Sequence, residues 1–202
     1  MPCSPLPAGD QKLIQIVNAA LADTVSRSGK WLACRPGCSH CCVGVFAINQ
    51  LDAVRLQYGL AQLEADDPAR ATRVKERALA SVERLKGEFP GDPQTGVLDE
   101  SEEAAVRFEN FANDEPCPAL DPVTGACDLY ASRPMTCRVF GPPVRSDEGL
   151  GVCELCYHGA TEEEIASCEM PVDPDDLEAE LVEELRQSGH RGQTVVAFAL
   201  VR

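Results

Sequence analysis

Eleven cysteines in a chain of 202 residues constrain this protein more than any other feature of its sequence. An odd number of cysteines cannot pair completely within one chain. Residues 1–7 lack the charged start and apolar run of a secretion signal, and no apolar stretch approaches the length of a membrane span. We therefore expect a cytoplasmic protein with reduced thiols, in which clustered cysteines bind metal.

Nine of the cysteines fall into two groups with the close spacing of metal ligands. The first group lies around a Pro-Gly turn, and the second ends in a C-x-x-C pair. The nine predicted ligands are Cys34, Cys38, Cys41, Cys42, Cys117, Cys127, Cys137, Cys153 and Cys156. We expect the other two, Cys3 and Cys168, to be a free thiol on a tail and a small buried side chain.

The charge of a thiolate site predicts cationic neighbours. Four thiolates around one zinc ion leave a net charge of −2, which nearby hydrogen-bond donors and cations must offset. Arg35, Arg133 and Arg138 each lie close to a cysteine in the sequence and are expected to surround the metal. The adjacent side chains of Cys41 and Cys42 point apart, so they serve different metal positions or only one of them is a ligand.

Composition favours a mainly α-helical fold of one domain, residues 1–202. Aromatic residues make up only 5% of the chain, so the core must consist of Ala, Val, Leu and Ile, which favours packed helices. We expect Cys-rich irregular loops over 31–48 and 115–157, a helical excursion over 49–114, and C-terminal helices with a tail over 158–202. The helical excursion is expected to form an antiparallel bundle that brings the two cysteine groups together around a metal centre.

Hydrophobic periodicity and capping residues predict the individual elements. Basic residues between 70 and 86 alternate with acids and predict a solvated helix face. The segment Asp-Pro-Val-Thr-Gly predicts the turn of a short β-hairpin. We expect helices over 10–28, from Asn49, from Asp67-Pro68 to before Gly91 and over 101–113. Further helices are expected after Arg133-Pro134, from Thr161, and from Asp173-Pro174 to Gly189. A terminal strand is expected over 194–201, beside 43–47.

The ordered cysteine pattern resembles a known family. Its parts are Cys34-x3-Cys38-x2-Cys41-Cys42, Cys117-Pro-Ala-Leu, Cys127-Asp-Leu-Tyr130, Arg133-Pro134 and Cys137-Arg138. Over residues 31 to 156 this set resembles the bacterial YkgJ-like cysteine-cluster proteins, described as zinc- or iron-chelating. The resemblance implies that the first seven clustered cysteines bind metal, with Cys153 or Cys156 as the eighth ligand. The chain differs from the family in having three residues between its first two cysteines.

Thiolate ligands suit an iron–sulfur cluster, iron or zinc. The asymmetric first spacing and the adjacent Cys41-Cys42 pair favour iron–sulfur or iron over zinc. A redox or protein-modification accessory is thus the first hypothesis, and the alternatives are a structural zinc module for protein–protein interaction and a metal carrier. The spacing also matches radical S-adenosylmethionine enzymes, but too few residues follow Cys41 for their barrel.

Net charge restricts the partners to metal and protein. Thirty-three acidic residues against eighteen basic ones give a net charge of −15, which argues against nucleic acid and anionic membranes. His40 and His158 each lie close to a cysteine and are weaker candidates for metal ligation than the thiols. The sequence indicates no catalytic residue.

Overall fold

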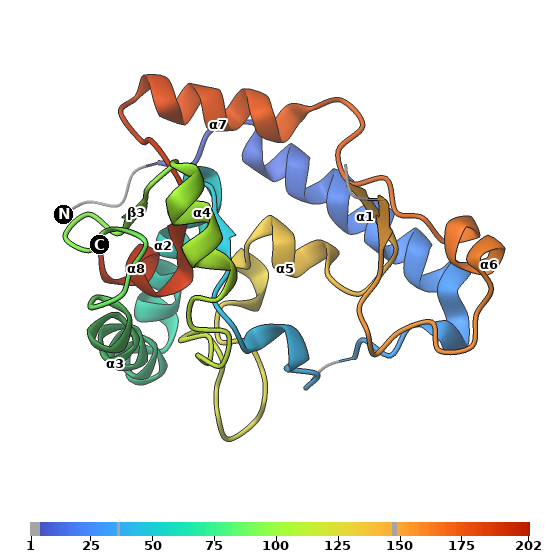
Figure 1. Cartoon of the computed structure of the whole chain (residues 1–202), viewed down its shortest axis with the longest axis horizontal. Coiled ribbons are helices and arrows are strands. Elements are labelled where there is room, and N and C mark those ends of the chain that lie inside the picture. The colour runs from blue at the N-terminus through green and yellow to red at the C-terminus, as the bar shows by residue number, and fades with distance from the viewer. Residues whose placement is uncertain (1–4, 36, 147–148) are drawn as a thin grey trace. The chain divides into compact units, whose positions relative to one another are not determined.

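The computed structural model describes residues 5–35, 37–146 and 149–202 (Figure 1). As expected, these residues are mainly α-helical. The helices are α1 (Asp10–Ser28), α2 (Gln50–Asp66), α3 (Pro68–Leu85), α4 (Glu102–Glu109), α5 (Met135–Val139), α6 (Glu162–Ser167), α7 (Leu177–Gln187) and α8 (Val196–Val201), with short 3-10 turns at Gly29–Trp31, His40–Cys42 and Tyr130–Ser132. The strands pair antiparallel as β1 (Ala47–Ile48) with β6 (Thr194–Val195), β2 (Gly91–Asp92) with β3 (Val97–Leu98), and β4 (Val144–Ser146) with β5 (Gly149–Gly151).

The described chain divides into two compact units. The larger unit contains residues 5–6, 37–134 and 182–202. The smaller unit contains residues 7–35, 135–146 and 149–181. Helices α2, α3, α4 and α8 belong to the larger unit, and α1, α5 and α6 belong to the smaller one.

The core of the larger unit lies where α2, α3 and α8 pack against one another. Leu56 of α2, Val74 of α3 and Ala199 of α8 are all buried in this cluster. Alanines at Ala71 and Ala78 line the buried face of α3, and such small side chains let neighbouring helices approach closely. The predicted core of aliphatic residues is confirmed here.

Aromatic residues fill a second cluster of the larger unit. The Phe89 ring lies 4.5 Å from Phe198 and 5.9 Å from Phe111, measured between ring centroids. Phe111 lies beyond the end of α4, so the predicted helix over 101–113 is too long. Ala112 has a positive φ of 51°, which is incompatible with continuing the helix.

The start of α3 confirms the predicted capping. The Asp67 carboxylate accepts a hydrogen bond of 3.0 Å from the backbone N–H of Arg70, and Pro68 occupies the first turn. Asn49 caps α2 in the same way by accepting from the N–H of Asp52 at 3.0 Å. Both helix starts therefore depend on side chains that bond within one turn of the chain.

The terminal segment is a strand only over its first two residues. Val195 pairs with Ala47 and Thr194 with Ile48 in an antiparallel register, whereas residues 196–201 form α8. The expectation of a strand over 194–201 is therefore wrong for most of its length. A short apolar run gives no periodic signal that separates a buried strand from a buried helix, and contact with α2 and α3 selects the helix.

In the smaller unit, α1 packs against α5. The Arg27 side chain at the end of α1 donates to the carbonyls of Ser167 and Glu169. Thr161 and Glu164 form the predicted capping box of α6. The helix predicted from Asp173 instead begins at Leu177, because the Asp173 carboxylate accepts from the N–H of Glu178 at 2.7 Å and holds a turn ahead of the helix.

Three short features differ from the sequence expectation or are absent from it. The segment around Asp121 forms one isolated antiparallel bridge, Leu120 with Cys127, in place of the predicted two-stranded hairpin. The β2–β3 and β4–β5 pairs had no counterpart in the sequence analysis.

In the part of the chain that the structure describes, no helix has the length and apolar character needed to cross a membrane.

Candidate metal centre

The larger unit brings Cys41 and Cys42 of the first group to Cys117 of the second. Cys41 and Cys42 end a 3-10 turn, and the backbone N–H of Cys117 donates to the carbonyl of Cys42 at 2.8 Å. The next residue along the first segment, Val43, forms an antiparallel bridge with Pro116. These contacts close the helical excursion at its base, as the sequence predicted.

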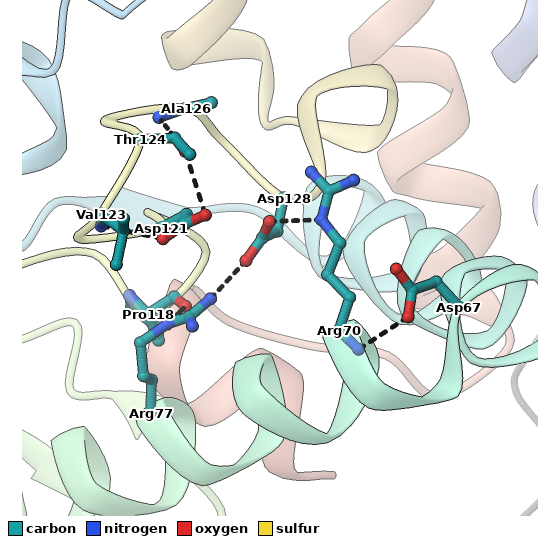
Figure 2. A network of polar contacts seen from close by, with 9 residues as sticks. All are labelled: Asp67, Arg70, Arg77, Pro118, Asp121, Val123, Thr124, Ala126 and Asp128. Carbon is teal, nitrogen blue, oxygen red and sulfur yellow. Dashed lines mark hydrogen bonds and ion pairs between the residues drawn. The ribbon is translucent and has the colours of Figure 1, made fainter.

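Cys117 and Cys127 lie on the two facing arms of one loop. The bridge between Leu120 and Cys127 joins the arms, and the N–H of Asp128 donates to the carbonyl of Ala119 at 2.7 Å. At the tip, the Asp121 carboxylate accepts from the N–H of Val123 and the hydroxyl of Thr124 (Figure 2). The loop is therefore held both at its tip and along its arms.

Four thiols of the larger unit interact electrostatically. Cys41 accepts a hydrogen bond from the thiol of Cys42, which lowers the pKa of Cys41 and raises the pKa of Cys42. The pKa of Cys42 is raised further by its burial and by the charges of Cys117 and Cys127. Because backbone contacts also bring the segments of these residues together, we call Cys41, Cys42, Cys117 and Cys127 the four-thiol cluster.

Burial dominates the acidity of the two loop cysteines. It raises the pKa of Cys117 to about 11, with a smaller contribution from the charge of Cys127. Burial likewise raises the pKa of Cys127. A neutral thiol is favoured at both positions until a cation is present to stabilise the thiolate.

Arg133 is the cation that the structure places beside the four-thiol cluster. Its guanidinium carbon lies 3.8 Å from the ring centroid of Tyr130, and the residue is buried. Its charge acts to lower the pKa of both Cys41 and Cys127. The role of Arg133 in offsetting thiolate charge stays a prediction, in agreement with this charge effect, and Tyr130 packs over the guanidinium.

Cys38 and His40 complete the predicted ligands of the larger unit. Cys38 is partly exposed, and His40 is exposed at the start of the 3-10 turn that carries Cys41. The positive charge of His40 acts to lower the pKa of Cys41. His40 therefore influences the four-thiol cluster through its charge.

The smaller unit holds the other predicted ligands. Cys153 and Cys156 are buried in an apolar cluster with Cys168 and Tyr157, and the N–H of Ala33 donates to the Cys156 sulfur at 3.4 Å. The remaining ligand candidates of this unit are Cys34, which is exposed, and Cys137, which lies on α5 and is partly buried.

Arg138 and Arg35 also belong to the smaller unit. Arg138 is buried on α5 and donates to the Asn18 side chain at 3.3 Å. Arg35 is exposed, and so is His158. Cys168 is the small buried side chain that the sequence predicted, whereas Cys3 lies outside the described residues.

The ten cysteines that the structure describes are all in the thiol form. Within residues 5–35, 37–146 and 149–202, no three His, Cys, Asp or Glu side chains already stand close enough together to hold a metal ion. The donors fit the group, because thiols in this number suit zinc or iron. Binding of either metal requires the sulfurs to lose their protons.

Sequence reasoning missed an ion-pair network next to the four-thiol cluster. Arg70 and Arg77, assigned to a solvated helix face, both donate to the carboxylate of Asp128 (Figure 2). The solvated-face interpretation holds for Lys75, which pairs with the exposed Glu64. The helical spacing of Arg70 and Arg77 was visible in the sequence, but their partner on the loop was not.

A helical scaffold whose loops carry clustered thiols is typical of cysteine-cluster metal-binding domains. Residues 33–157 match the model of the CxxCxxCC family, described as a putative zinc- or iron-chelating domain. The chain belongs to this family, and the match confirms the resemblance seen in the sequence. Comparison with curated proteins and with solved structures gives no significant match.

Proposed function

We propose that the protein binds iron or zinc through its clustered cysteines, with Cys41, Cys42, Cys117 and Cys127 as the central ligands. The observation that carries this proposal is that backbone contacts join the segments of these four cysteines within one unit, through the bond from the N–H of Cys117 to the carbonyl of Cys42 and the bridge between Leu120 and Cys127. The family description supports the same chemistry. Cys34, Cys38, Cys137, Cys153 and Cys156 are the further proposed ligands.

The residues around the thiols prepare them for a cation. Partial burial at Cys117 and Cys127 limits their contact with water, and Arg133 offsets the negative charge that the thiolates acquire. The hydrogen bond from Cys42 to Cys41 favours one thiolate before the others ionise. An iron–sulfur cluster supplies electron transfer when bound.

The first candidate role is a redox or protein-modification accessory in the cytoplasm that carries iron or an iron–sulfur cluster. It is supported by more thiols than one zinc ion needs and by the asymmetric C-x3-C-x2-C-C spacing.

A structural zinc module that binds a protein partner is the second candidate. A cavity of about 20 Å³ adjoins Cys117 and Pro118 and has room for about one water molecule. Four thiolates around one ion form the closed kind of site that is typical of structural zinc. The acidic surface implied by a net charge of −15 suits a basic protein partner.

Metal and acid-labile sulfide analysis of protein purified without air distinguishes the two roles. Iron with sulfide, together with an absorbance band of the protein at about 400 nm, supports the redox role. Colourless protein with tightly held zinc supports the structural module. Protein that contains neither metal, and takes up neither from solution, contradicts the proposal.

Replacement of single cysteines tests the ligand assignment. We expect Cys127→Ser and Cys38→Ser to lower metal content and melting temperature, because binding energy is folding energy in such sites. Cys168→Ala is the matched control, since it removes a buried thiol outside the proposed ligands and should leave metal content unchanged. Full metal content and unchanged melting in both serine variants would show that the assignment is wrong.

A further inference from the structure

Two arginines of α3 converge on one buried carboxylate. Arg70 Nε and Arg77 Nη2 each lie 2.5 Å from an oxygen of Asp128, one on Oδ1 and the other on Oδ2 (Figure 2). The Asp128 side chain is only 2% exposed, whereas those of Arg70 and Arg77 are 38% and 24% exposed. A carboxylate buried this deeply needs such partners, because an unpaired buried charge is costly.

Arg77 makes a second contact that a simple ion pair does not need. Its Nε donates to the carbonyl of Pro118 at 2.8 Å. Pro118 directly follows Cys117, and Asp128 directly follows Cys127. One guanidinium is therefore bonded to the residue after each of the two loop cysteines.

This arrangement fixes the two arms relative to each other. The arms are already joined by the bridge between Leu120 and Cys127 and by the bond from the N–H of Asp128 to the carbonyl of Ala119. The Arg77 side chain adds a link at Pro118, the residue next to Cys117. Because the guanidinium is planar and rigid, its two bonds constrain the separation of the residues that carry the sulfurs.

Attachment of α3 does not require this link. Ala71, Val74 and Ala78 already bury one face of the helix in the core of the larger unit. The contacts of Arg77 with the loop are therefore not needed to hold α3 in the core.

We propose that Arg77 is a positioning residue of the metal centre, which holds Cys117 and Cys127 at the spacing that the metal requires. Arg70 supports it by fixing the other oxygen of Asp128. The inference rests on the proposed binding of metal by these two cysteines. In this proposal, the Arg77 side chain of α3 sets the separation of the two cysteines.

The test measures Zn²⁺ affinity of the full, reduced chain by competition with a chromophoric chelator under anaerobic conditions. We expect Arg77→Met to weaken binding by about 10- to 100-fold, as loss of residues that orient metal ligands does elsewhere. We expect Arg77→Lys to weaken it as much, because an ammonium group cannot bond both arms in the fork geometry. Lys75→Met is the matched control on the same helix, since its exposed pair with Glu64 should change affinity by less than about threefold.

Two further measurements separate positioning from folding. The metal-free Arg77→Met variant should melt below Lys75→Met, because the buried Asp128 loses one of its two partners, but its far-ultraviolet circular dichroism at low temperature should match that of the control. The thiolate-to-metal absorbance of bound Co²⁺ should be weaker per ion in Arg77→Met than in the unchanged protein, which reports altered geometry at the sulfurs.

The affinities and circular dichroism spectra of these variants decide whether Arg77 positions the two cysteines. Unchanged affinity in Arg77→Met overturns the inference, and so does a metal-free variant whose circular dichroism shows that its fold is already lost. Full affinity in Arg77→Lys would show that charge, and not the link between the arms, is what matters. If the unchanged protein binds no Zn²⁺, or Cys117→Ser and Cys127→Ser bind it as tightly as the unchanged protein, the proposed function itself fails and the inference fails with it.

Discussion

Gly96 occupies a position that no other residue type fits. Its φ is 58°, and a Cβ built there would lie 2.5 Å from the Phe198 side chain. Backbone strain and overlap with a buried ring therefore act together. The close approach lets the β2–β3 turn lie directly against α8.

Gly96→Ala should lower the free energy of unfolding by at least about 2 kcal/mol, because it combines a left-handed backbone with an overpacked contact. Urea denaturation followed by circular dichroism measures the change. Gly87→Ala is the control, since φ is not positive there and no atom lies within 4 Å of the new methyl group. Equal stabilities of the two variants would contradict this account.

The spacing of the cysteines predicts them as site residues, because metal ligation imposes local patterns on a sequence, and that assignment stays a prediction. Asp128 and its partners could not be predicted in this way. Arg70 and Arg77 lie 58 and 51 residues before Asp128 in the chain, so their pairing depends on the tertiary fold. The division of the cysteines between two units was likewise invisible, since sequence spacing carries no information about long-range contacts.

Helix starts are the elements that sequence reasoning predicted best. Asp67, Asn49 and Thr161 each cap the helix that follows them, as the pattern of residues predicts. These interactions span only a few residues, so tertiary contacts do not override them. The expected strand over 194–201 was mostly wrong for the opposite reason, because the packing partners of that segment are α2 and α3, far away in the sequence.

Removing the cap of α3 should destabilise the helix that carries Arg70 and Arg77. We expect Asp67→Ala to lower the free energy of unfolding by about 1 kcal/mol, since the first-turn N–H of Arg70 loses its acceptor. Asp66→Ala removes a neighbouring exposed acid that does not cap α3 and serves as the control. Urea denaturation of both variants checks the prediction, and a larger loss in the control would refute it.

At the scale of the whole molecule, charge is the dominant property. Acids outnumber bases by fifteen, and several ion pairs, such as Lys86 with Glu83, are exposed. Exposed pairs of this kind contribute little to stability. Mutual repulsion among the excess acids therefore opposes the compact state more than surface pairing supports it.

Salt should consequently stabilise the protein. Raising NaCl from about 10 mM to about 0.5 M shortens the screening length severalfold and should raise the melting temperature of the reduced protein by several degrees. Differential scanning fluorimetry measures the shift, and KCl at equal ionic strength controls for effects of the particular cation. A melting temperature that falls with both salts would be inconsistent with self-repulsion.

The position of α8 in the core has a consequence for biosynthesis. Residues 50–85 form α2 and α3, yet the helix that covers them consists of residues 196–201. A ribosome therefore releases every proposed ligand, from Cys34 to Cys156, before it releases the segment that completes the core. During that interval the nascent thiols are exposed to the redox state and metal supply of the surrounding solution, so translation itself opens a window for metal loading ahead of final folding.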